Sequence, residues 1–584
     1  MGQQLGGDRV ARMLAAEGVE VVFGIVDGSY FGLYSRLREH GIRLVSPRHE
    51  TSAAHMAGAC ARLTGTLGVC IASNGPGAAN LLPGIAVENG EGNRVLAITS
   101  WRRSPIVNPD RGGTYQYFDQ VAVARGMTKW SGAAMSYERL PELLRRAFRI
   151  AWSGRPGVVH LAVPEDVLNG SFEAPAADAP PERYRLCEPL AAPAEQVRRA
   201  ADLLLGAEAP MIHAGSGVLH ARASGELREV AELLRAPVTT SWAARDVIDE
   251  RAPVAIPMPY IELNQQVRTE ADVVLALGTR FGETDWWGKP PYWRSPATQR
   301  LVQVDIDEEI LGLNKPVDLA VLADARAFLA ALAAELKGRD LGERRDAREA
   351  RLQRCGSARA AARAKLDEAL AVDTTPLHTA RVAPICQAVF EDDAILAIDG
   401  GNTAIWANVY HEVRTTHTLV STWKFGMLGA GVAQALGAKV ALPERQVCCI
   451  IGDGAMGFHC QEIETAVRER LPVVFVVLCD RQWGMVKVNQ EFAIDPRRTL
   501  LEGGLRPEEN INTDLGEIRF DLLAEAMGAH GERVAAASEL RPALERSLAS
   551  GRCAVVHVDV DRRAHKFAPH LAVFKEMHQE PKGE

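Results

Sequence analysis

The stretch that decides the fold begins Ile450-Ile451-Gly452-Asp453-Gly454-Ala455 and ends Val477-Leu478-Cys479-Asp480. Residues 447–451 and 471–478 are apolar runs typical of buried parallel strands, and residues 461–470 between them have helical spacing. A strand–turn–helix–strand unit predicts a parallel sheet that binds ligands at the carboxyl ends of its strands. Both strand ends carry an acid, Asp453 and Asp480, so we expect the two carboxylates to lie close together.

Two carboxylates beside a glycine turn suit a divalent cation that in turn holds a diphosphate. Mg²⁺ prefers oxygen ligands and commonly shares one or two carboxylates with phosphate groups. A helix N-terminus adds affinity for the anion. A lone Gly-Asp-Gly is more often an ordinary turn, and the acid after the next strand is what favours a metal site here.

This stretch resembles the thiamine diphosphate-binding signature of the acetolactate synthase-like enzymes: Gly-Asp-Gly, a helix, a strand and Asn-Asn. The resemblance implies Mg²⁺ held by Asp453, Asp480 and the backbone carbonyl of Gln482. Because Cys479-Asp480 replaces Asn-Asn, we expect an extra charge to alter metal affinity and its pH dependence. The match also implies cofactor contacts from Gly452, Gly454, Ala455, Trp483, Gly484 and Met485.

Composition excludes several classes of protein. The 584 residues are 47% hydrophobic and 24% charged, as in a globular protein, and the net charge of -8 comes without the basic block of a nucleic-acid binder. No apolar run is long enough to span a bilayer, and the N-terminus lacks the pattern of a signal peptide. Ten cysteines without a Cys-x-x-Cys pair favour reduced core residues in the cytoplasm.

Alternating strand and helix patterns predict an α/β protein with three doubly wound parallel-sheet domains. We place an N-terminal domain at residues 1–183, a Rossmann-like middle domain at 190–350 and a C-terminal domain at 370–560. Residues 561–584 form a tail that is either a lid over the active site or a solvated segment. By resemblance, the first domain binds the pyrimidine of the cofactor and the third its diphosphate and Mg²⁺.

His49-Glu50 precedes a helical pattern rich in small residues. On the residues alone, an acid here favours the start of a helix. The run also resembles the family pattern His-Glu-x-x-Ala-x-x-Met-Ala, which gives Glu50 the role of bonding the cofactor pyrimidine. Proton transfer of this kind contributes about 10²- to 10⁴-fold to the rate.

Other matched positions complete the implied site. Asn80 lies in a Gly-Pro-Gly-x-x-Asn loop that lines the cavity in the family, and Gln116 matches an active-site Gln. Leu428 falls where a large apolar residue wedges beneath the cofactor, although an ordinary core role fits it as well. The remaining cofactor contacts are Gly401, Asn402 and Thr403 in one turn and the carbonyl of Gly426.

Glycine turns and acids at strand ends also mark the middle domain, at residues 215–217, 278–281 and 305–307. Relatives use this domain for FAD, for ADP or for structure alone. The sequence leaves the nucleotide open.

The reaction is less well determined than the cofactor. Asn489 stands where acetolactate synthases have Trp. Glu491 either shuttles a proton or bonds a substrate hydroxyl in the pocket, or it is a surface acid. Arg562, Arg563 and Lys566 would suit a phosphorylated substrate such as an acyl-CoA. We therefore expect 2-hydroxyacyl-CoA lyase chemistry, with an acetolactate synthase-type decarboxylase or carboligase as the alternative. Glu50 together with both metal ligands argues against a non-catalytic scaffold.

The resemblance further implies a homodimer or homotetramer. Glu50 would then come from one subunit and the diphosphate site from the other. No nucleic-acid or membrane partner is expected, only a small-molecule substrate.

Overall fold

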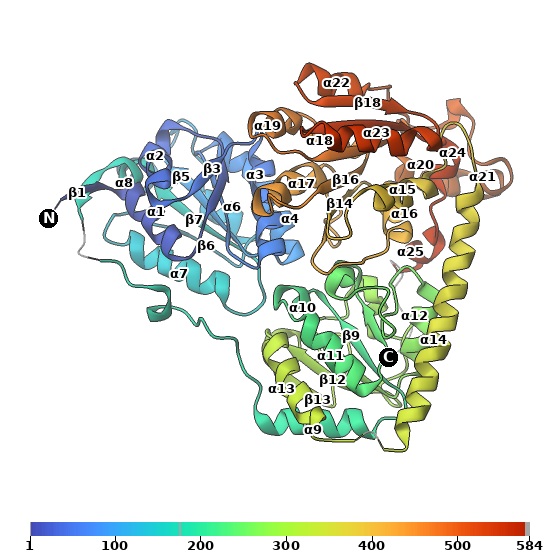
Figure 1. The fold of residues 1–584 in the computed structure, drawn as a ribbon. Coiled ribbons are helices and arrows are strands. Elements are labelled where there is room, and N and C mark those ends of the chain that lie inside the picture. The colour runs from blue at the N-terminus through green and yellow to red at the C-terminus, as the bar shows by residue number, and fades with distance from the viewer. Residues whose placement is uncertain (1, 175–176, 341, 578–584) are drawn as a thin grey trace.

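The computed structural model describes residues 2–174, 177–340 and 342–577. It contains three parallel sheets of five or six strands flanked by helices, which confirms the predicted fold class. In Figure 1 the first and third domains lie side by side, and the middle domain lies below them. Of the described helices, none has both the length and the apolar character that crossing a bilayer requires.

The first sheet has the strand order β3-β2-β4-β5-β7-β6. Because side chains alternate along a strand, Val69 and Ile71 face one core while Cys70 and Ala72 face another. Short strands β1 (Gln3–Leu5) and β8 (Ser171–Glu173) pair antiparallel outside it. Its strands are β2 (Val21–Gly24), β3 (Arg43–Val45), β4 (Gly68–Ala72), β5 (Val95–Trp101), β6 (Trp130–Ala133) and β7 (Val158–Pro164). Its helices are α1 (Gly6–Ala16), α2 (Phe31–Leu37), α3 (Glu50–Thr64), α4 (Pro76–Glu91), α5 (Ser104–Val107), α6 (Gln120–Arg125), α7 (Leu140–Trp152) and α8 (Glu165–Asn169).

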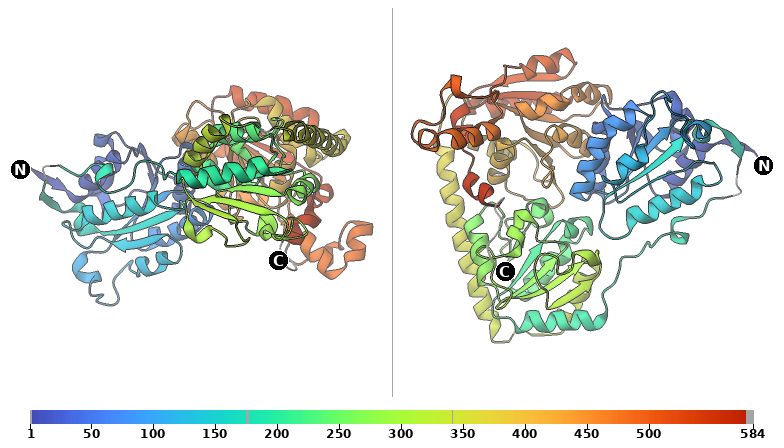
Figure 2. Two further views of the ribbon diagram at one scale, coloured as in Figure 1. Left: turned by 90° about the horizontal axis from the view of Figure 1, so that it is seen from below. Right: turned by 180° about the vertical axis from the view of Figure 1, so that it is seen from behind.

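The middle sheet has the order β10-β9-β11-β12-β13. Helix α14 runs along the edge of this domain up to the third domain, as both Figure 1 and Figure 2 show. Its buried Arg348 donates to carbonyl oxygens of Leu204 and Leu234, at the ends of two helices. The strands are β9 (Pro210–Ala214), β10 (Val238–Thr240), β11 (Val273–Leu277), β12 (Arg300–Asp305) and β13 (Leu319–Leu322). The helices are α9 (Ala194–Gly206), α10 (Ser216–His220), α11 (Ser224–Leu234), α12 (Ile261–Glu270), α13 (Ala325–Lys337) and α14 (Arg344–Asp367).

The third sheet has the order β15-β14-β16-β17-β19-β18, so the two strands of the deciding stretch are neighbours. The tight turn expected at residues 452–454 is replaced by a direct passage from β16 into α18, which begins at Asp453. The strands are β14 (Ile395–Asp399), β15 (Leu419–Val420), β16 (Val447–Gly452), β17 (Val474–Cys479), β18 (His530–Val534) and β19 (Ala554–Asp559). The helices are α15 (Val382–Val389), α16 (Asn402–Tyr410), α17 (Ala430–Ala441), α18 (Asp453–His459), α19 (Glu462–Arg468), α20 (Gly484–Ile494), α21 (Pro496–Glu502), α22 (Phe520–Ala526), α23 (Ala537–Ala549), α24 (Arg562–Lys566) and α25 (Leu571–Met577).

The first and third domains share one apolar core. Ala53 and Ala57 of α3 belong to the same buried cluster as Val432 and Leu436 of α17. The middle domain has a separate core of its own. The two domains that carry the predicted cofactor residues are thus held together more closely than either is to the middle domain.

Candidate active site

The carboxyl ends of β14, β16 and β17 lie side by side in the third sheet. Gly452 pairs with Leu478, so Asp453 and Asp480 follow at the same edge. Both acids are buried, with 9% and 3% of their surface exposed. The prediction that neighbouring strand ends bring the two acids to one edge of the sheet therefore agrees with the structure.

Both carboxyl groups are harder to ionise in the folded protein than in water. Burial, and then the charge of Asp480, raises the pKa of Asp453 to about 7, and burial raises the pKa of Asp480 to about 6. Asp453 accepts hydrogen bonds from the backbone N–H groups of Gly454 and Arg481, at 2.8 and 2.7 Å. Asp480 accepts one from the Gln482 side chain at 2.9 Å. A bound cation would relieve the repulsion between these two oriented acids.

The oxygen donors fit a hard cation such as Mg²⁺, which needs only one or two protein carboxylates. Among the described residues, no cluster of three or more His, Cys, Asp or Glu could hold a metal. The predicted Mg²⁺ site is not such a cluster, because it has only two carboxylates, and its third protein ligand is the backbone carbonyl of Gln482. It requires further oxygen ligands from a bound phosphate or water.

Glycines let the predicted cofactor turns approach each other closely. A Cβ added to Gly452 would lie 3.0 Å from the Thr403 hydroxyl oxygen, and one added to Gly484 would lie 2.9 Å from the Asn402 amide nitrogen. Similar contacts link Gly401 with Met485 and Gly454 with the Trp483 ring. The buried Asn402 Oδ1 has no hydrogen-bond partner among the described residues. We call these closely packed turns the cofactor cradle. Asn402 Oδ1 is available there to bond a ligand, beside the N-terminus of α16.

The first domain supplies a second group of predicted residues. Glu50 is the first residue of α3, and Asn80 Nδ2 donates to its Oε2 at 3.1 Å. Gln116 has a φ of 55°, uncommon for a residue other than glycine, and its carbonyl accepts from Asn74 at 3.3 Å. Asn80 and Gln116 are exposed and Glu50 is partly exposed. Among the described residues, no hydrogen bond or ion pair joins these three to Asp453 or Asp480.

The segment of residues 421–429 contacts both the first and the third domain. Gly426 has a φ of 67°, and Leu428 packs partly buried against the core that the first and third domains share. Glu91 at the end of α4 accepts hydrogen bonds from the backbone N–H groups of Lys424 and Phe425, both at 2.8 Å. Leu428 therefore has the core contacts that its simpler interpretation predicts, and its proposed wedge role stays a prediction.

Helix α20 presents two different faces. Val486 is 57% exposed and Asn489 is also exposed, as residues that face a substrate would be. Glu491 is 1% exposed and lies on the other face, where Lys566 Nζ donates to both its oxygens at 2.7 and 2.8 Å. The burial of Glu491 shows that its interpretation as a surface acid is wrong. The other two predicted roles, a proton shuttle or a partner of a substrate hydroxyl, did not anticipate this ion pair.

The tail is folded onto the protein. Arg562 pairs with Asp514 at 2.6 Å, and Arg563 is exposed close to Gly503. Helix α25 contacts the middle-domain segment Glu283–Gly288. Residues 578–584 of the expected lid lie outside the described residues.

His565 is a site residue that was not predicted from the sequence. Its ring nitrogens lie 2.9 Å from the Thr379 hydroxyl and 3.3 Å from the Thr403 hydroxyl, and Nε2 lies 4.0 Å from an Asp480 oxygen. Its place directly after the last strand was the only available signal. The tail therefore contributes a buried side chain to the predicted metal and diphosphate site.

A cavity of about 480 Å³ lies where the middle domain meets the first domain and the loop of residues 421–429. Gly215 and Gly217 touch the backbone of Gly278 there. Three cations, Arg155, Arg280 and Lys424, and the strand-end acid Asp305 line it. Burial raises the pKa of Asp305 to about 6.

Comparison with known proteins supports the same organisation. Three family models match in chain order: the N-terminal TPP binding domain of thiamine pyrophosphate enzymes over residues 5–123, their central domain over 197–332 and their C-terminal TPP binding domain over 399–558.

Whole-length relatives match as well. A sulfoacetaldehyde acetyltransferase of Alcaligenes xylosoxydans xylosoxydans is 31% identical, over 91% of this chain and 88% of that protein. A probable acetolactate synthase large subunit of Methanococcus aeolicus is 28% identical over 93% and 90%. The acetolactate synthase isozyme 3 large subunit of Escherichia coli K12 is 29% identical over 96% of both. The chain therefore belongs to the thiamine diphosphate-dependent enzymes, within the acetolactate synthase-like family.

Proposed function

We propose that this enzyme uses thiamine diphosphate and Mg²⁺ to break or form a carbon–carbon bond beside the carbonyl group of a 2-oxo acid, as in the acetolactate synthase type. The supporting observation is the cradle of glycine turns around the buried pair Asp453 and Asp480, found in a chain that also keeps Glu50 hydrogen-bonded and partly exposed. The relatives named acetolactate synthase favour this substrate class.

Each residue has a separate task in this proposal. Asp453, Asp480 and the Gln482 carbonyl hold Mg²⁺, while the turn of residues 401–403 and the start of α18 bind the diphosphate. Thiamine diphosphate, when bound, supplies a carbon nucleophile and an electron sink. Glu50 holds a proton at the pyrimidine nitrogen, and the Asn80 amide orients its carboxylate. Gly426 and Leu428 position the ring portion of the cofactor.

The enzyme acts as a homodimer or homotetramer in this proposal, with Glu50, Asn80 and Gln116 facing the cofactor held by a second copy. Their exposure, and the absence of bonds from these described residues to the acid pair, support a shared site. Mixing inactive Glu50→Gln and Asp453→Asn proteins after subunit exchange should restore activity to about a quarter of that of the wild type, since half the dimers would carry one intact site. No restoration, with exchange verified by mass spectrometry, would argue for a site within one chain.

The middle-domain cavity is proposed to hold ADP or FAD. Close-packed glycines at strand ends, cations for a diphosphate and an acid at the end of β12 are the features of nucleotide sites in sheets of this kind. Denaturing the purified protein and analysing the released small molecules by absorbance and mass spectrometry distinguishes ADP, FAD and no nucleotide.

The alternative proposal is 2-hydroxyacyl-CoA lyase chemistry. It rests on tail cations that would meet the phosphates of coenzyme A, yet Arg562 and Lys566 already pair with Asp514 and Glu491. We therefore favour the 2-oxo acid substrate. A parallel assay of pyruvate, sulfoacetaldehyde and a 2-hydroxyacyl-CoA, each with cofactor and Mg²⁺, decides between them. Carbon dioxide with acetolactate from pyruvate supports our choice, and formyl-CoA from the thioester overturns it.

Replacing Glu50 by Gln tests the mechanism for any of these substrates. We expect kcat to fall by about 10²- to 10⁴-fold, because the amide cannot exchange a proton with the pyrimidine nitrogen. Glu39→Gln, at an exposed residue of the same domain, should leave kcat unchanged. Activity of Glu50→Gln within tenfold of the wild type would remove Glu50 from the mechanism.

A further inference from the structure

Helix α24 lies between the two halves of the cofactor cradle. On one side, the backbone oxygen of Lys566 accepts from Asn402 Nδ2 at 3.3 Å, and that of His565 accepts from Trp406 Nε1 at 2.9 Å. On the other side, the backbone oxygen of Arg562 accepts from Gln482 Nε2 at 2.9 Å. The turn after β14 and the turn after β17 are thus both bonded to the same short helix.

One ion pair connects this helix to α20. Lys566 and Glu491 are 5% and 1% exposed, and Lys566 Nζ also donates to the Gly503 carbonyl at 3.2 Å. A lysine ammonium has three N–H donors, so these three hydrogen bonds leave none for a substrate. A carboxylate that accepts two of them is held away from the exposed face that carries Val486 and Asn489.

We infer that Lys566 and Glu491 are positioning residues, whose ion pair fixes α24 and α20 so that the turns bearing Asn402 and Asp480 keep the spacing that the cofactor requires. This inference rests on the proposed use of thiamine diphosphate and Mg²⁺. It assigns the pair an effect on cofactor affinity and on the orientation of Asn489, instead of a place in proton transfer or substrate binding.

Two observations make the pair specific to this task. Its partners are 75 residues apart, so it ties the tail to the segment that follows the metal ligands. Gly504 also lies against it, since a Cβ there would be 2.5 Å from a Glu491 oxygen and 3.0 Å from Lys566 Nζ. Outer residues that orient metal ligands typically change metal affinity or activity by 10- to 100-fold when they are replaced.

The test measures cofactor binding directly, by titrating the full-length apoprotein with thiamine diphosphate in excess Mg²⁺ and following tryptophan fluorescence or heat. We expect Lys566→Met and Glu491→Gln each to raise the Kd by about 10- to 100-fold. The kcat at saturating cofactor should change far less. Amide hydrogen exchange should rise over α20 even without cofactor.

The charge-reversed double variant, Lys566→Glu with Glu491→Lys, restores an ion pair and should have a Kd at least tenfold lower than that of either single charge-reversal variant. The matched control is the exposed pair of Lys337 and Glu229, 2.6 Å apart on the middle domain, where Lys337→Met and Glu229→Gln should leave the Kd unchanged. Folded single variants that bind cofactor within threefold of the wild type would overturn the inference. So would a large loss of kcat at saturating cofactor with an unchanged Kd.

Failure of the proposed function gives a different result, because the wild-type protein itself would then not bind thiamine diphosphate. In that case amide hydrogen exchange still tests the positioning role. Unchanged protection of α20 in the variants would overturn that role. If Lys566→Met does not fold, Glu491→Gln carries the test with the same Kd and exchange criteria. Lys566→Arg, which keeps the charge, should bind cofactor close to the wild-type Kd.

Discussion

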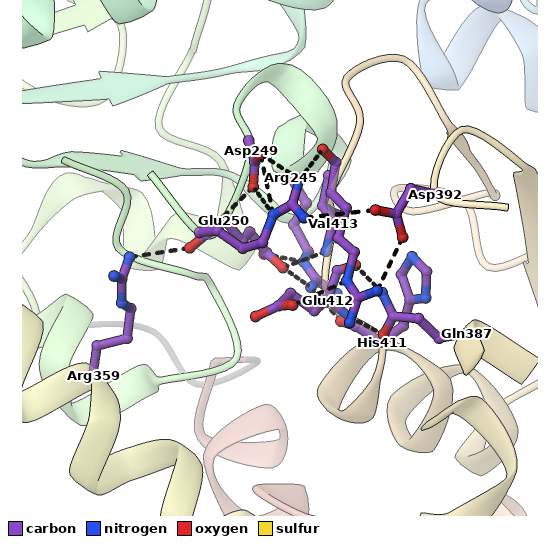
Figure 3. Close-up of polar contacts among 11 residues, drawn as sticks. Arg245, Asp249, Glu250, Arg359, Gln387, Asp392, His411, Glu412 and Val413 are labelled. Atoms are coloured by element: carbon purple, nitrogen blue, oxygen red, sulfur yellow. Dashed lines mark hydrogen bonds and ion pairs between the residues drawn. The ribbon is translucent and has the colours of Figure 1, made fainter. Parts of the chain in front are cut away.

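The third domain contacts its two neighbours in opposite ways. Toward the first domain, α17 packs on α3 through small side chains, and a Cβ added to Gly437 would lie 2.5 Å from the Met56 carbonyl oxygen. Toward the middle domain, the contact is a buried polar network around Arg245 (Figure 3). Added side-chain volume should therefore destabilise the first interface, whereas loss of a charged partner should destabilise the second.

Arg245 lies in the 3₁₀ segment Trp242–Val247 and is 1% exposed. Its guanidinium donates to both oxygens of Glu250, at 3.0 and 2.8 Å, and to the backbone oxygens of Asn408 and His411 at the end of α16. A cation is favourable at a helix C-terminus. Because α16 begins at Asn402 in the cofactor cradle, the middle domain holds the far end of a helix whose near end serves the active site.

The largest effect is expected at the polar interface. Arg245→Met leaves Glu250 buried without its cation, so the free energy of unfolding should fall by about 3–5 kcal/mol. Urea denaturation followed by circular dichroism measures it. Arg251→Met, at an exposed pair with Asp249, should cost about 0–1 kcal/mol. If both variants cost the same, the buried network is not what holds the two domains together.

A smaller loss is expected where volume is limiting. Gly437→Ala forces a methyl group against the backbone of α3, which should lower the free energy of unfolding by about 1–3 kcal/mol. Gly356→Ala in α14, with open space around its Cβ, should stabilise by up to about 1 kcal/mol. A neutral Gly437→Ala in the same denaturation experiment would show that α3 and α17 can separate without cost.

Several charged residues bond across the contact between the first and third domains. One of them, Glu91, makes the stability of this contact depend on pH. Burial raises its pKa from 4.5 to about 7, although two backbone N–H groups bond it. Between these values the folded chain holds a proton that the unfolded chain has released, so this residue favours folding more as the pH falls.

Glu91→Gln removes that dependence. The stability of the wild type relative to Glu91→Gln should decrease by about 1.4 kcal/mol for each pH unit between pH 5 and 7, and level off above. Denaturation curves at pH 5, 6, 7 and 8 measure the difference. Parallel pH profiles for the two proteins would mean that the Glu91 carboxyl titrates normally in the folded state.

The sequence alone determined the parallel sheets and the meeting of Asp453 with Asp480. Both follow from local pattern, because apolar runs alternating with helical segments form adjacent parallel strands, and parallel strands end at one edge of the sheet. The same reasoning, with the family resemblance, placed Glu50 at the start of α3.

Only the tertiary structure decided the pairing of Lys566 with Glu491, the contact of His565 with Thr403 and the place of Arg245 at the end of α16. None of these has a periodic signal, and the partners in each contact are far apart in the sequence. Each depends on how helices dock after the sheets have formed, and burial then requires every charge to find a partner. Arg562, Lys566 and Glu491 looked unpaired in the sequence because their partners lie in distant segments, which only the fold brings together.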